Sequence, residues 1–86
     1  MGRNDEALAE AELAVKYDKN NIWYKANYAK ASRLNDNYDD YVRTYEELVE
    51  AEPYDINFVY ELAFAYQFTG DYRNAIIAYD KIEELM

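Results

Sequence analysis

The residues of this chain that are capable of chemistry are mainly carboxylates. Three adjacent pairs occur, Asp39-Asp40, Glu46-Glu47 and Glu83-Glu84. Neighbouring side chains of a helix point about 100° apart, so the members of such a pair do not converge on one substrate atom. The chain has no Cys and no His, and so it lacks a thiolate nucleophile and the commonest general base and metal ligand. We therefore expect no enzyme and no bound cofactor.

One set of oxygen ligands has the spacing of a calcium-binding loop. It consists of Asn35, Asn37, Asp39 and Tyr41, followed by Glu46. The sixth position of such a loop needs Gly for its sharp turn, but Asp40 stands there. A helical pattern also begins already at position 38. We therefore expect a turn between helices, with Asn37 as the helix N-cap, and no metal site.

The composition excludes several classes of partner. The 86 residues carry nine Lys and Arg against 18 Asp and Glu, a net charge of −9, and the pI is about 4.3. Such a charge disfavours nucleic acid and anionic membrane surfaces. No apolar run approaches the length of a membrane span, and no targeting signal is found, so the sequence is compatible with the cytoplasm or a periplasm.

The spacing of apolar residues predicts an all-α protein. They recur at three- and four-residue steps, which is the helical period. Local stop and start signals divide the chain: Asn21, Asp55 and Asp71 are good N-caps, while Pro53 and Gly70 end helices. We predict five antiparallel helices at residues 5–17, 22–34, 38–51, 56–68 and 72–85.

A period of 34 residues relates the two halves of the sequence. Identical residues 34 apart are Tyr38 and Tyr72, Tyr45 and Tyr79, and Ala29 and Ala63. Stepping back from position 41 brings Ala7 into the same register as Tyr41 and Ala75. A fixed period built from paired helices of about 13 residues is typical of helical solenoids.

With these residues in place, the sequence resembles the tetratricopeptide repeat family. The last repeat matches its pattern best, at Leu62-Ala63, Tyr66, Gly70-Asp71-Tyr72, Ala75 and Tyr79. The middle repeat matches at Tyr38, Tyr45 and Pro53, with Tyr41 in place of an alanine. Small Ala29 and Ser32 on the facing helix are expected to make room for that ring. The resemblance covers a half repeat (1–21) and two repeats (22–55 and 56–86), which together form one domain and imply a right-handed helical-hairpin solenoid.

The resemblance also implies a function, which is non-catalytic binding of a peptide or helix of a partner protein in a concave groove. The first helix of each of the two full repeats would supply the groove residues, which are Trp23, Asn27, Lys30, Arg33, Asn57, Tyr60, Glu61, Phe64 and Gln67. The segment 22–34 contains three cations and no acid, which favours an acidic ligand. Alternatively, these cations offset the acids of residues 38–52, and the aromatic stripe at positions 60, 64 and 68 packs within the protein or against another chain.

The two ends of the array suggest a second function. In the repeat pattern a preceding helix would cover Ala7 and Ala11, and a following helix would cover Ile77 and Leu85. Solenoid units need neighbours to bury their faces. Two explanations are open: the sequence is a fragment of a longer array, or these ends pair between chains. The alternative hypothesis is therefore a structural segment that forms homo-oligomers by stacking or hairpin exchange, with no ligand in its groove.

Overall fold

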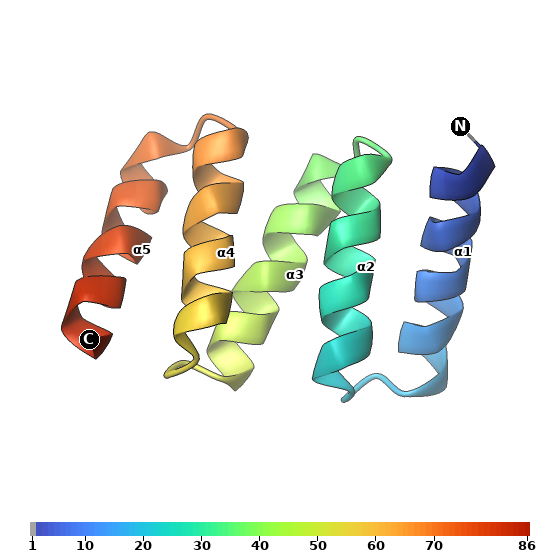
Figure 1. Ribbon diagram of the computed structural model, residues 1–86, viewed down its shortest axis with the longest axis horizontal. Helices are drawn as coiled ribbons and strands as arrows, with labels where there is room; N and C mark the ends of the chain where they lie inside the picture. The colour runs from blue at the N-terminus through green and yellow to red at the C-terminus, as the bar shows by residue number, and fades with distance from the viewer. Residues whose placement is uncertain (1) are drawn as a thin grey trace. The chain divides into compact units, whose positions relative to one another are not determined.

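The computed structural model describes residues 2–86, and within this range it contains five α-helices and no β-strand (Figure 1). These are α1 (Gly2–Tyr17), α2 (Ile22–Leu34), α3 (Tyr38–Ala51), α4 (Ile56–Phe68) and α5 (Tyr72–Leu85). The all-α prediction is confirmed, and four helices begin and end where the sequence predicts. The remaining helix, α1, begins at Gly2, three residues before its predicted start at residue 5. Polar residues extend it ahead of the apolar pattern that starts at Ala7.

The helices α2 and α4 have matching N-caps. Asn21 Oδ1 accepts hydrogen bonds from the backbone N of Trp23 at 3.0 Å and of Tyr24 at 3.1 Å. Asp55 Oδ1 accepts from the backbone N of Asn57 at 3.0 Å and of Phe58 at 3.3 Å. Both cap residues have extended backbone angles, as an N-cap requires. The caps lie 34 positions apart, and so do the starts of α2 and α4.

The turns that follow these helices also match. Asn37 N donates to Ser32 O at 2.8 Å, and Asp71 N donates to Tyr66 O at 2.8 Å. Each turn contains one residue with a left-handed backbone, Asp36 (φ 62°) in the first and Gly70 (φ 86°) in the second. This is the Schellman geometry that closes a helix and satisfies its last carbonyls.

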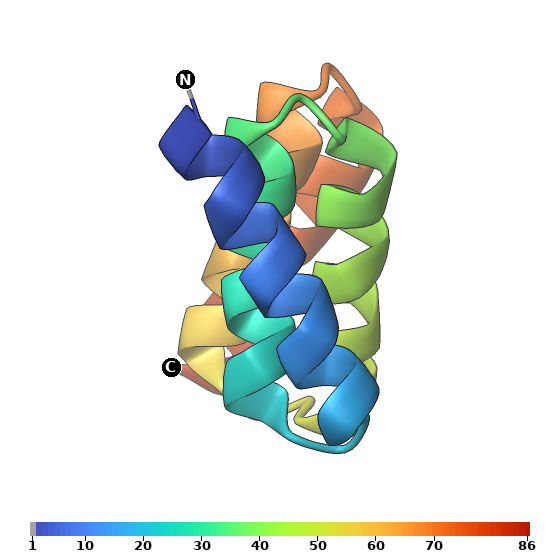
Figure 2. The same cartoon turned by 90° about the vertical axis from the view of Figure 1, so that its right-hand side faces the viewer.

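The chain divides into two compact units, residues 1–44 (unit 1) and 45–86 (unit 2), and α3 runs from one into the other. In unit 1, α1 packs against α2, and the two helices run in opposite directions (Figure 2). Asn35 Nδ2 donates to Asn4 O at 2.7 Å and links the ends of this pair. The first half of α3 packs on α2, where Tyr28 OH donates to Asp40 Oδ2 at 3.1 Å.

The interior of unit 1 combines one large ring with small side chains. Tyr41 is 1% exposed, and Ala29 and Ser32 of α2 are fully buried. All three residues are buried in unit 1; that the small residues make room for the ring stays a prediction.

In unit 2, α4 packs antiparallel against α5 (Figure 1). Its interior includes Val59 and Ala63 of α4 and Ala75 and Ala78 of α5. Small side chains on both helices allow the backbones to approach closely. The second half of α3 contributes buried Leu48, and it is tied to α4 because Tyr66 OH donates to Glu46 Oε2 at 2.5 Å.

Candidate functional site

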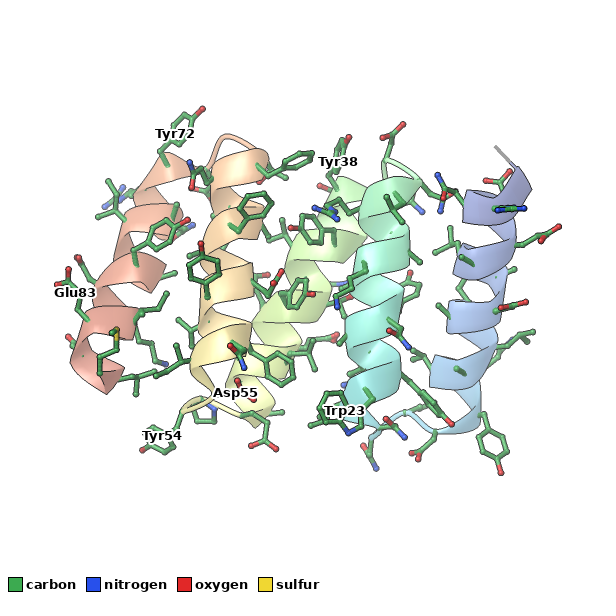
Figure 3. All side chains as sticks on the ribbon, viewed as in Figure 1. Trp23, Tyr38, Tyr54, Asp55, Tyr72 and Glu83 are labelled. Carbon is green, nitrogen blue, oxygen red and sulfur yellow. The ribbon has the colours of Figure 1, made fainter. Side chains whose placement is uncertain are left out.

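The first candidate surface is one side of α2, formed by Trp23, Asn27, Lys30 and Arg33 and called here the α2 face. Trp23 lies at the start of the helix and is 71% exposed (Figure 3). Asn27 and Lys30 are exposed one and two turns further on. Residues three and four apart share one side of a helix, so an amide, an ammonium group and an indole are available to one ligand. Among the described residues, Lys30 makes no ion pair.

Arg33 differs from the rest of the α2 face because it is half-buried. Its guanidinium carbon lies 5.9 Å from the centre of the Tyr41 ring, a distance at which the ring attracts the cation. Arg33 also stands in the last turn of α2, where the helix dipole favours positive charge. The guanidinium is therefore held in place before any ligand arrives.

The second candidate surface is the aromatic shelf of α4, formed by Tyr60, Phe64 and Phe68. Their side chains are 53%, 38% and 49% exposed. The rings of Phe64 and Phe68 are stacked with centroids 6.1 Å apart. Tyr60 meets Tyr79 of α5 edge to face at 6.2 Å. These contacts orient the rings and still leave large parts of them open to solvent, as a binding surface requires.

The other predicted residues of α4 are polar. Asn57 and Gln67 are exposed and Glu61 is half-buried. Gln67 Oε1 accepts a hydrogen bond from Tyr79 OH at 2.8 Å, which fixes its amide beside the shelf. Glu61 is the only charged residue of α4, so this helix offers no cation to a carboxylate ligand.

The predicted end residues are exposed to different degrees. Ala7 and Ile77 (59%) are exposed, whereas Ala11 is buried and Leu85 is half-buried. Ala7 and Ala11 line a groove of about 430 Å³ between α1 and α2, called here the α1–α2 groove. Its α2 side includes Lys30 and Leu34, so it borders the α2 face.

A pocket larger than the α1–α2 groove was not predicted from the sequence. It has a volume of about 810 Å³ and is formed by α1, the residue Lys19 that follows it, and Tyr28 of α2. Leu13 lines it and is 65% exposed, beside Lys16 and Glu12. Glu12, Lys16 and Lys19 are of the types expected on a solvated helix, so only the apolar Leu13 could have indicated this pocket.

Two phenols that bond acidic residues of α3 have raised pKa values. Burial raises the pKa of Tyr66, and the hydrogen bond to Glu46 raises this pKa further. Burial is also the main cause that raises the pKa of Tyr28, whose hydroxyl bonds Asp40. Both phenols therefore stay protonated at neutral pH. They are hydrogen-bond donors inside the fold and are not tuned as bases or nucleophiles.

The turn with calcium-like spacing has a different structure. Residues 38–46 belong to α3, and a helix holds these side chains at fixed angles that do not encircle an ion. Tyr38 OH donates to Asp36 Oδ1 at 2.9 Å, and Asp40 pairs with Arg43. Across residues 2–86, no group of three or more acidic side chains is placed to hold a metal ion.

Charge is distributed unequally along the chain. Unit 1 has seven Lys and Arg against eight Asp and Glu, a net charge of −1. Unit 2 has two against ten, a net charge of −8. Within α2 the charged residues are Lys25, Lys30 and Arg33, all positive. The basic residues of this acidic protein are thus concentrated in the unit that carries the α2 face.

Comparisons with the models of known protein families and with curated proteins give no match. None of the helices in the described part of the chain is long and apolar enough to span a membrane.

Proposed function

We propose that the protein is a helical solenoid of the tetratricopeptide type, with one half repeat followed by two repeats. Four pairs of structural features support this, and the two members of each pair lie 34 positions apart. They are the starts of α2 and α4, the starts of α3 and α5, the caps Asn21 and Asp55, and the left-handed residues Asp36 and Gly70. Repeated local structure of this kind is what a repeated sequence unit produces.

The function we propose is non-catalytic binding of an acidic peptide or helix of a partner protein. The observation that carries it is the α2 face, which is basic in a protein of net charge −9. Lys30 is exposed and makes no ion pair within the described residues. A ligand carboxylate would gain charge-assisted hydrogen bonds there, and these are stronger than bonds between neutral groups.

Each residue of the α2 face has a role in this proposal. Lys30 and Arg33 bind a ligand carboxylate, and the Arg33 guanidinium is already oriented by Tyr41. Asn27 adds an amide that can bond the backbone of the ligand. Trp23 supplies a broad apolar ring, a type of residue enriched where proteins bind one another.

The aromatic shelf of unit 2 is a separate candidate surface for apolar recognition. Tyr60 and Phe64 are held by ring contacts to Tyr79 and Phe68, so they lose little freedom when a ligand binds. The shelf suits an aromatic or aliphatic side chain. On the α2 face, Trp23 supplies the apolar contact, so a ligand of that face carries an acidic residue together with a large apolar one.

The experiment begins with a display library of short random peptides selected against the protein. We expect enrichment of sequences that contain Asp or Glu together with aromatic residues. The double variant Lys30→Glu/Arg33→Glu should bind a selected peptide at least tenfold more weakly in fluorescence anisotropy, because it replaces attraction by repulsion. Its helicity by circular dichroism should match that of the wild type.

The matched control is Lys16→Glu/Lys19→Glu, which makes the same change of net charge elsewhere in unit 1. It should retain binding, apart from a small change in the association rate. If the control and the α2 variant lose affinity equally, only the overall charge matters and the α2 face is not the site. The single variant Lys30→Glu separates the ligand contact from the packing of Arg33 on Tyr41.

A further inference from the structure

The side of α5 that faces away from α4 has exposed apolar residues. Ile76 and Ile77 are 61% and 59% exposed, whereas Ala75 and Ala78 on the α4 side are buried. Glu83 projects away from α4 (Figure 3), and Asp80 is exposed as well. The outer face of α5 is defined here as Ile76, Ile77, Asp80, Glu83 and Glu84. It is a small apolar patch with exposed Arg73 one turn before it and the acidic residues one to two turns after it, and exposed apolar patches of this kind associate with other surfaces.

Helix α1 has exposed positions whose equivalents in α3 and α5 are buried. Ala75 and Ala78 of α5 are buried, and so are Tyr41 and Thr44 of α3, which lie 34 positions earlier. Another 34 positions earlier stand residues 7 and 10 of α1, and both are exposed. This side of α1 is therefore covered in the two equivalent helices and bare here.

The bare side of α1 coincides with the α1–α2 groove. On the α1 side this groove is lined by Ala7, Glu10, Ala11 and Ala14. Ala31 and Leu34 line it from α2, and Leu34 is 53% exposed. A channel of about 430 Å³ with small residues along one wall admits protruding side chains such as Ile76 and Ile77.

Charge distinguishes between the ways in which two copies can meet. Contact between two outer faces of α5 brings together two units of net charge −8. Contact between the outer face of α5 and the α1–α2 groove brings a −8 unit to a −1 unit, at a groove lined by one cation, Lys30, and one acid, Glu10. Like charges at an interface are strongly disfavoured, so the second arrangement is preferred.

We infer that the α1–α2 groove binds the outer face of α5 of a second copy of this chain. Ile76 and Ile77 enter the groove, and the acidic edge of α5 meets Lys30. The two surfaces are different patches of the chain, so the contact is heterologous: the groove of one copy binds the patch of another. This interaction goes beyond the proposed peptide binding, although Lys30 belongs to both surfaces.

Two variants, each lacking one surface, test the inference. Ala7→Trp fills the groove, and Ile76→Ser/Ile77→Ser removes the apolar patch without changing the charge. The molar mass of the wild type by light scattering should exceed 10.2 kDa and rise further between about 10 µM and about 1 mM, as mass action requires. Each variant alone should stay at the monomer mass. A one-to-one mixture should reach twice that mass and stop there, because it retains one intact groove and one intact patch.

The control is Ala9→Trp, which adds the same side chain to another exposed position of α1 and should behave as the wild type does. If Ala7→Trp loses helicity by circular dichroism, Leu34→Asp replaces it as the groove variant. The inference is wrong if the wild type remains a monomer over the whole concentration range. It is also wrong if the groove variants still form dimers while the patch variant does not, since this result means that two outer faces of α5 meet.

Discussion

At the scale of single residues, the most informative contact is the one between the phenol of Tyr66 and Glu46. The 2.5 Å hydrogen bond joins α4 to the second half of α3, and burial together with this bond raises the pKa of the phenol above its ordinary value of 10.0. The folded protein therefore holds this proton more tightly than the unfolded chain does. Its contribution to stability is complete below about pH 10 and is lost as the pH rises toward the pKa of the folded state.

Replacing Tyr66 by Phe tests this linkage. At pH 8 we expect Tyr66→Phe to lower the free energy of unfolding by about 0.5–1 kcal/mol, because the phenol is only partly buried and a solvated bond contributes little. Above about pH 10 the wild type should lose stability more steeply than the variant, so that the two curves converge. Urea unfolding followed by circular dichroism at several pH values measures this. Parallel curves would show that Tyr66 does not carry the linkage.

How far the sequence predicts the candidate site depends on how local each contact is. The register of the family resemblance placed Trp23, Asn27 and Lys30 on the groove side of the helix, and all three are exposed. The placement of Arg33 over Tyr41 could not be predicted in this way, since it depends on a ring from the next helix. The edge-to-face contact of Tyr60 with Tyr79 is also tertiary, and periodicity contains no information about it.

At the scale of helices, the boundaries were almost entirely predictable because their signals are local. A cap acts within three residues, as the bonds from Asn21 and Asp55 to the following backbone N–H groups show. The left-handed turn at Gly70 is equally local. The first helix is the exception, because nothing in its first residues marks a start.

The paired caps give a prediction at this scale. Asp55→Ala should lower the free energy of unfolding by about 1 kcal/mol, because two backbone N–H groups lose their acceptor at the start of α4. Asp55→Ser should recover most of that loss, since a hydroxyl can accept the same bonds. Chemical denaturation of the three proteins under identical buffer conditions provides the comparison. An equal loss in the Ser and Ala variants would show that charge, and not capping, makes Asp55 stabilising.

At the scale of the whole molecule, the unequal charge of the two units has consequences for stability. Unit 2, with a net charge of −8, must fold against its own repulsion. The ion pair found among the described residues, Arg43 with Asp40, lies in unit 1, and the side chain of Arg43 is 65% exposed. Such a pair contributes little. Added salt therefore screens much repulsion and little attraction.

We expect the midpoint of thermal unfolding to rise with salt. The screening length falls from about 30 Å at 0.01 M salt to about 3 Å at 1 M. A gain of about 1 kcal/mol would shift the midpoint of a chain of this size by about 4–8 °C. Circular dichroism at low protein concentration measures the shift without interference from self-association.

Two further measurements assign the salt effect to unit 2. The variant Glu83→Gln/Glu84→Gln removes two of its ten acids, so it should melt higher than the wild type at low salt and respond less to added salt. Hydrogen exchange should show a larger gain of protection in α4 and α5 than in α1 and α2, because repulsion is concentrated in the former pair. A midpoint that falls with salt would mean that attractive pairs dominate, and the uneven charge would then have no part in limiting the stability of this fold.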